Sequence, residues 1–165
     1  MALWQVSFAI FPDRHFAGVN AIAESRLIAL LAGNEPAFTG FFLPTTYQSQ
    51  IEDLLAPAKS WAPDLELWGD SASDDFSIWR DARGIVSIEV RIDVRKLNDA
   101  LIAGVLRIAK DWNCTLVEKE HRTICRFGPT ELRQLLTGHV SNRAMRDPAV
   151  WLPHLAKQAA NDQRP

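Results

Sequence analysis

Hydrophobic and polar residues alternate along several stretches of the chain, most clearly over residues 85–95. Every second position from Val86 to Val94 is apolar, and the positions between them carry Ser87, Glu89, Arg91, Asp93 and Arg95. A period of two is typical of a strand with one buried and one wet face. Because the charges alternate in sign along the polar face, we expect cross-strand ion pairs there.

Shorter apolar runs predict the other strands of the sheet. Residues 4–11 alternate in the same way and stop at Pro12-Asp13. A hairpin turn is expected at 81–84, because Asp81-Ala82-Arg83-Gly84 separates two strand-like runs. The further strands are predicted at 38–43, 65–68, 76–81, 115–119 and 122–127.

Helical spacing of apolar residues predicts four helices. Residues 19–32 form the first, with Gly33 as its C-cap, and Thr45 or Thr46 begins a brief second helix that ends before Pro57. Asn98 is the expected N-cap of a helix that runs to Trp112. A last helix begins at 128–130, residues 147–152 form a docking turn, and the chain becomes polar after Lys157.

The order of these elements predicts an α+β fold. We expect a mostly antiparallel sheet with helices packed on one face, in a ferredoxin-like split β-α-β arrangement. No internal repeat or linker divides the chain. Residues 1–165 therefore form a single domain, with a polar tail over about 158–165.

Composition narrows the class of protein. The chain has 165 residues, of which 47% are hydrophobic and 23% charged, as in ordinary globular domains. Its two cysteines, Cys114 and Cys125, are too few for a disulfide framework and are expected to be buried reduced thiols. No apolar run is long enough to cross a membrane, and residues 1–5 lack the features of a signal peptide. We therefore expect a cytoplasmic protein.

The charge is unevenly distributed. Residues 1–82 carry 4 Lys/Arg and 11 Asp/Glu, and residues 83–165 carry 14 and 9, so the halves have net charges of −7 and +5. The acidic charge peaks over residues 64–81, where only Arg80 opposes it. Either the two halves neutralise each other within the domain, or the acidic stretch attracts a basic partner.

No sequence motif points to catalysis. The chain lacks the glycine-rich loops of nucleotide-binding proteins and the signatures of hydrolases and zinc proteases. His15 and His121 lie in loops, and His139 and His154 have no carboxylate or cysteine at ligand spacing. We predict no catalytic residue, cofactor or metal site, and nucleic-acid binding is not expected because few aromatic residues accompany the cations.

Tryptophan is the unusual residue of this sequence, with six copies. Trp61 lies in a loop and is the best candidate for an exposed anchor, whereas Trp4, Trp68, Trp79 and Trp112 lie on core-like elements. The predicted partner-binding surface combines tryptophans with the acidic stretch, and consists of Trp61, Asp64, Glu66, Trp68, Asp70, Asp74 and Asp75.

A set of short segments carries a resemblance to a known group of proteins. The segments are Leu43-Pro44, 54–57, Ser60-Trp61, 67–70, 91–95, 111–117, Asp147-Pro148 and Trp151-Leu152. They resemble small uncharacterised bacterial proteins, some of which are similar to immunity proteins encoded beside polymorphic or type VI-secreted toxins. The resemblance implies a protein that binds and neutralises a toxin, and it carries over no catalytic residue. We therefore hypothesise a non-enzymatic cytoplasmic protein that acts by occlusion, for which the acidic stretch makes a basic toxin domain the natural partner.

Two other hypotheses remain open at this point. The chain is alternatively a small enzyme acting on a phosphate or carboxylate substrate, in which Arg91 or Arg95 lines a pocket with His15 or His121 and a carboxylate. A third hypothesis is a homo-oligomeric structural module, in which the polar sheet face at 87–95 packs against its own copy.

Overall fold

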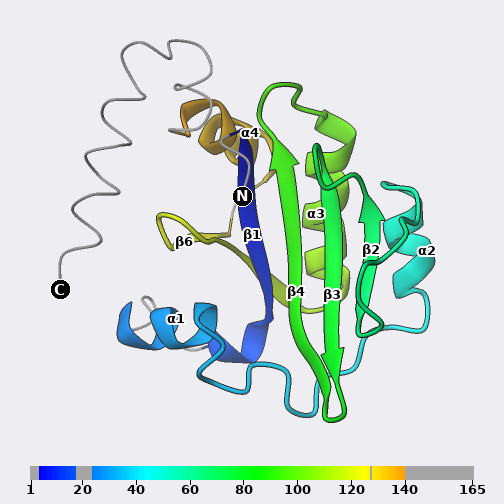
Figure 1. Cartoon of the computed structure of the whole chain (residues 1–165). Coiled ribbons are helices and arrows are strands. Elements are labelled where there is room, and N and C mark those ends of the chain that lie inside the picture. Colours follow the sequence, from blue (N-terminus) through cyan, green and yellow to red (C-terminus); the bar gives the residue numbers. More distant parts are fainter. Residues whose placement is uncertain (1–3, 18–23, 127, 140–165) are drawn as a thin grey trace, which may run out of the picture.

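The computed structural model describes residues 4–17, 24–126 and 128–139. Within them, six strands form one antiparallel sheet with the order β2-β3-β4-β1-β5-β6 (Figure 1). The predicted α+β class and the antiparallel sheet are therefore confirmed. The strands are β1 (Gln5–Pro12), β2 (Leu65–Gly69), β3 (Asp75–Asp81), β4 (Gly84–Asp93), β5 (Cys114–Glu118) and β6 (Thr123–Cys125).

The first strand lies in the middle of the sheet. β1 pairs with β4 on one side and with β5 on the other, and all eight of its residues are buried. Val6, Phe8 and Ile10 are at most 1% exposed and belong to the main hydrophobic core. Burial on both sides explains why β1 carries large apolar residues without a charged position.

Helix α3 (Asp99–Asp111) covers one face of the sheet (Figure 1). Its N-cap is Asn98, as predicted, and the Asn98 side chain accepts hydrogen bonds from the backbone N–H groups of Ala100 and Leu101. Trp112 follows the helix and packs edge-on against Phe76 of β3. The face of the sheet that contacts α3 is therefore the one that carries Phe76, Ile78, Ile88 and Val90.

Three shorter helices surround this layer. α2 (Tyr47–Glu52) lies beside α3, where the indole of Trp112 donates a hydrogen bond to Gln50. α4 (Pro129–Gly138) also packs against α3, and Arg133 forms an ion pair with Asp99. α1 (Glu24–Leu31) lies near β6 and the end of β1, next to the short 3-10 turn Asp13–His15 (Figure 1).

The connection from β4 to β5 crosses the central strand. Both strands run antiparallel to β1, so they are parallel to each other with β1 inserted between them, and α3 connects them. Strand β1 from the first half of the chain is thereby paired with β4 and β5 from the second half. Helix α3 covers only one face of β3, β4 and β1, and it does not cover the opposite face.

That second face, which we call the open face, carries Ser77, Trp79, Ser87, Glu89 and Arg91. The predicted cross-strand ion pairs are present there, because Arg91 of β4 pairs with the buried Asp75 of β3. Lys119 also reaches Glu89, with 2.8 Å between Nζ and Oε1. Lys119 directly follows β5, and Glu89 is on β4, so this ion pair crosses β1. The β1 residues beneath it, Ser7 and Ala9, are small and leave room for the Lys119 side chain.

Two sequence predictions about strands need correction. Residues 38–43 form turns and loop rather than a strand, because Phe38 and Phe41 use their rings to pack against Phe11 and each other. Val86 is 51% exposed rather than buried, because it is the extra residue of a bulge that shifts the register between β3 and β4. The regular alternation holds from Ser87 onward.

The cysteines have the predicted state. Cys114 and Cys125 are free and buried, and burial raises the pKa of each thiol to about 12. None of the helices in the described ranges has the length and apolar character needed to cross a membrane. The predicted turn at 147–152 and the polar tail at 158–165 lie outside the described residues.

Candidate functional site

Among the tryptophans in the described ranges, the most exposed one lies on the open face. The Trp61 side chain is 77% exposed, and its ring packs edge-on against Trp79 of β3 with 5.2 Å between the centroids. Trp79 is half-buried and lies opposite Ser87 of β4 and Leu65 of β2. The indole of Trp79 therefore supports Trp61 from below, while much of the Trp61 ring remains in contact with water.

The chain reaches this position along the edge of the sheet. Pro57 forms a bridge with Trp68, and the N–H of Ala58 donates to the carbonyl of Leu67, so this segment extends the sheet beyond β2. Ser60 then makes reciprocal hydrogen bonds with Ala62. This tight turn holds Trp61 over the sheet.

The acidic stretch contributes less free charge than the sequence predicts. Asp75 is buried and paired with Arg91, and Glu66 is paired with Arg80. Asp74 is half-buried and accepts the backbone N–H of Asp93 at 2.7 Å. Burial raises the pKa of Asp74 and of Asp75, so neither behaves as an ordinary surface carboxylate.

Two of the predicted acidic residues face solvent. Asp64 and Asp70 are exposed, and Asp70 also accepts the N–H of Ala72 within its own turn. Trp68, by contrast, is 4% exposed and packs edge-on against Phe76 in the core. The structure therefore brings Trp61 and Asp64 together with Trp79 at one end of the open face, and places Trp68 and Asp75 inside the protein.

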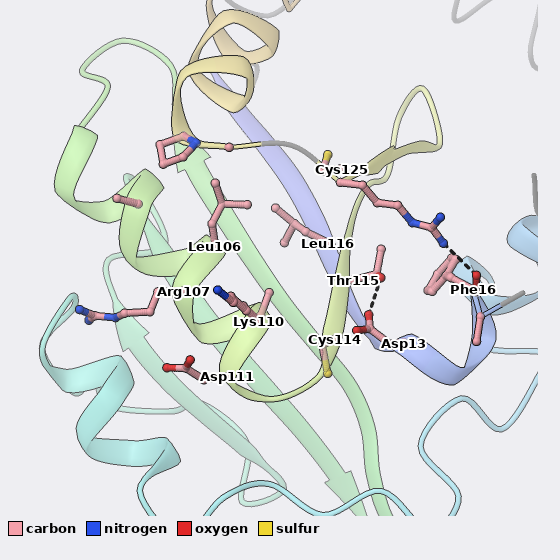
Figure 2. Close-up of a pocket in the computed structure, with 16 residues that line it drawn as sticks. Asp13, Phe16, Leu106, Arg107, Lys110, Asp111, Cys114, Thr115, Leu116 and Cys125 are labelled. Atoms are coloured by element: carbon pink, nitrogen blue, oxygen red, sulfur yellow. Dashed lines mark hydrogen bonds between the residues drawn. The ribbon is translucent and has the colours of Figure 1, made fainter. Parts of the chain in front are cut away.

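A broad groove of about 1040 Å³ lies on the other side of the molecule, between α3, β5, β6 and the start of α4 (Figure 2). Leu106 and Leu116 form part of its apolar floor, and Lys110 projects between them and Cys114. The Thr115 hydroxyl donates to Asp13 at 2.6 Å along one wall. Among its described lining residues there is no histidine.

The constellation expected for an enzyme is not assembled in this groove. Arg91 and Arg95 do not line it, since their guanidinium groups pair with Asp75 and Asp93. His15 is buried elsewhere, with its Nε2 2.7 Å from the carbonyl of Ala37. The hypothesis of an enzyme acting on an anionic substrate remains a prediction without a site of the expected composition among the described residues.

Four titratable residues do meet at a different place, near the turn between β5 and β6. They are Glu118, Glu120, His121 and His139, and one ligand atom from each lies within 4.8 Å of all the others. Glu118 ends β5, and it lies opposite Phe8 and therefore on the α3 side of the sheet. His139 follows the last residue of α4.

Glu118 organises this cluster. Its carboxylate accepts the backbone N–H groups of Glu120 and His121 at 2.6 and 2.8 Å, and His121 Nδ1 lies 3.1 Å from Glu118 Oε2. Burial opposes ionisation of Glu118, but hydrogen bonds from His139 and from these backbone groups outweigh it and hold its pKa below the ordinary value. The carboxylate is therefore charged at neutral pH although its side chain is 1% exposed.

The spacing of residues along the chain did not predict this cluster. It places His121 in a loop and gives His139 no carboxylate or cysteine at ligand spacing. The signal that was available is Glu118-Lys119-Glu120-His121, which places three ligand-type residues within one turn. That His139 joins them depends on how α4 packs, which a local spacing rule does not test.

No protein-family model, curated protein or solved structure matches this chain.

Proposed function

We propose that this protein is a non-enzymatic, cytoplasmic protein-binding module, and that it acts as an immunity protein that neutralises a toxin by occlusion. The exposed Trp61, supported by Trp79, is the observation that carries the proposal. Tryptophans at the centre of protein interfaces are frequent hot spots, because they bury a large apolar surface when a partner covers them. Trp61 already exposes a large apolar surface before any partner binds.

The surroundings of Trp61 favour a particular kind of partner. Asp64 is exposed and directly precedes β2, whose first residue Leu65 lies opposite Trp79. An apolar pocket with a basic rim would receive the Trp61 ring and face this carboxylate. Charge complementarity of this kind accelerates association and selects among partners, while the buried ring supplies affinity.

The test uses the product of a neighbouring toxin-like gene, produced together with the full-length protein. We expect a stable complex by co-purification and light scattering, and Trp61→Ala should weaken it at least tenfold. Ile28→Ala is the matched control, because Ile28 is also an exposed hydrophobic residue. It lies on α1, which is beside β6 and the end of β1 and away from β3 (Figure 1). Equal binding by both variants, or no complex, would contradict the proposal.

The same experiment distinguishes the proposed function from the hypothesis of a homo-oligomeric module. A stable dimer of the chain alone that Trp61→Ala converts to a monomer would show that the open face binds a second copy. A monomer that binds the toxin-like protein would instead support the proposed function.

We further propose the ferredoxin-like arrangement for the fold. It is supported by the β4-α3-β5 unit that spans β1 and by the antiparallel neighbours β3 and β4. The two short helices α1 and α2, with β2, then occupy the place of the other crossover helix.

A further inference from the structure

The cluster between the β5–β6 turn and the end of α4 has the composition of a metal centre. Two imidazoles and two carboxylates are ligands that Zn²⁺ accepts in proteins. Two of the four side chains, those of Glu118 and His139, are at most 2% exposed. The other two, those of Glu120 and His121, are about half-exposed. An ion could therefore enter from the solvent side and be held against buried ligands.

The spacing of the ligand atoms fits a single ion. Four ligands at about 2.0–2.1 Å from a tetrahedral Zn²⁺ lie about 3.3 Å from one another. His139 Nε2 lies 3.4 Å from Glu120 Oε2 and 3.7 Å from Glu118 Oε1. His121 Nδ1 lies 3.1 Å from Glu118 Oε2. Small movements of the two half-exposed side chains would complete the geometry.

The backbone prepares this arrangement. Glu120 and His121 lie in the tight turn between β5 and β6, which ends at Arg122 with a positive φ of 57°. The two N–H groups that Glu118 accepts fix its carboxylate in place. Ligands held by such surrounding hydrogen bonds lose little freedom when they bind an ion.

The charges in the cluster also call for a cation. Two carboxylates whose oxygens lie within 4.8 Å repel each other, and Glu118 is removed from water. A protonated imidazole can offset part of this repulsion, and a divalent ion can offset all of it. A metal ion would in addition strengthen the link between the β5–β6 turn and the end of α4, which His139 already makes with Glu118 and Glu120.

We propose that Glu118, Glu120, His121 and His139 bind one Zn²⁺ ion as a structural site. All four ligands come from the protein, which is typical of structural rather than catalytic zinc. The proposal does not depend on the function of Trp61, because the cluster lies near β5 and α4, whereas Trp61 contacts β3.

Direct titration tests the site. Untagged, full-length protein that has been treated with EDTA is titrated with Co²⁺ and followed by visible absorption, and Zn²⁺ is then added to displace it. We expect saturation at one equivalent, the intense bands of tetrahedral Co²⁺, and loss of those bands with Zn²⁺. Zn²⁺ should also raise the Tm, because it binds the folded state.

Variants locate the ion. Glu120→Gln and His121→Ala alter half-exposed side chains, so folding should be retained, which circular dichroism checks. Each should weaken binding at least tenfold, and the double variant should abolish it. Glu89→Gln is the matched control, since Glu89 is a partly buried, ion-paired carboxylate on the open face.

Three outcomes would overturn the proposal. One is no saturable binding to the wild-type protein, which would leave the cluster as a network of hydrogen bonds and polar contacts without an ion. Another is binding by the double variant with wild-type affinity, which would place the ion elsewhere. The third is a loss of metal affinity in Glu89→Gln as large as that in Glu120→Gln and His121→Ala. None of them bears on complex formation through Trp61.

Discussion

Glu66 shows how one side chain of the acidic stretch is engaged by its surroundings. The Tyr47 hydroxyl donates to Glu66 Oε2 at 2.7 Å, and Arg80 Nε lies 2.5 Å from Oε1. The Arg80 guanidinium also lies over the Tyr47 ring, 5.6 Å from its centroid. The three side chains therefore form a closed group in which the carboxylate holds α2 against the edge of the sheet.

This group makes stability depend on pH. Burial disfavours the charged form of Glu66, but hydrogen bonds from Arg80 and Tyr47 outweigh it and lower the Glu66 pKa below its ordinary value. The carboxylate thus contributes stability above the unfolded-state pKa of about 4.3, and this contribution is lost as pH falls through the lower folded-state pKa. Glu66→Gln should be less stable than wild type by up to about 1 kcal/mol at pH 6.

Urea unfolding of both proteins between pH 6 and pH 3 measures this difference. We expect it to shrink as the pH falls below the unfolded-state pKa and through the lowered folded-state pKa, because protonated Glu66 resembles glutamine. Tyr47→Phe, which removes one donor to the carboxylate, should show a smaller difference over the same pH range. A difference that grows as pH falls would mean that Glu66 does not stabilise the fold through its charge.

At the scale of elements, the sequence predicts the regular segments well. The strand predicted from the alternation over 85–95 is present as Gly84–Asp93, and the helix predicted from Asn98 to Trp112 is present as Asp99–Asp111. A long period of two and the Asn98 cap leave few alternatives for these segments. The strand predicted at 38–43 is wrong, since an apolar run by itself does not distinguish a strand from a loop whose rings pack on the core. The hydrophobic pattern therefore predicts secondary structure correctly where it is long and periodic.

The candidate sites are harder to predict because they join distant elements. The exposure of Trp61 was expected from its loop, but its support by Trp79 depends on how the segment before β2 crosses the sheet. Likewise, Glu118 and His139 meet only because α4 returns its C-terminal end to β5. Neither contact is encoded in the spacing of neighbouring residues.

The packing of α3 against the segment after α2 depends on one small residue. Gly104 lies in the buried face of α3, and a Cβ atom at this position would lie only 2.7 Å from Cδ1 of Leu54. Alanine would favour the helix by about 1 kcal/mol, whereas overpacking costs about 1–3 kcal/mol. We therefore expect Gly104→Ala to destabilise the wild-type protein.

A double-mutant cycle isolates this contact. In a Leu54→Ala background the space beside Gly104 is available, so Gly104→Ala should become stabilising through its helix propensity. The coupling between the two substitutions, measured by urea unfolding, should be at least about 1 kcal/mol. Additive effects would show that α3 and Leu54 do not constrain each other.

At the scale of the whole molecule, the two oppositely charged halves are interleaved. Asp75 of the acidic half pairs with Arg91, and Glu24 pairs with Arg122 of the basic half. The sheet order explains this arrangement, because β1 from the first half lies between β4 and β5 from the second. Part of the charge asymmetry is therefore neutralised inside the domain, as one of the two sequence interpretations expects.

The same sheet order predicts how stability is distributed. β1 is hydrogen-bonded on both sides and wholly buried, so exposing its amides requires separation of β4, β5 and the core. β6 has three residues, and within the part of the chain that the structure describes it pairs only with β5, so it can open alone. Native-state hydrogen exchange should therefore give β1 amides an opening free energy near that of global unfolding, and β6 amides a clearly lower one. Equal protection of the two strands would show that the domain opens only as a single unit. Zn²⁺ bound by Glu118, Glu120, His121 and His139 should slow exchange in β6 more than in β3, because the ion would hold together the turn that joins β6 to β5.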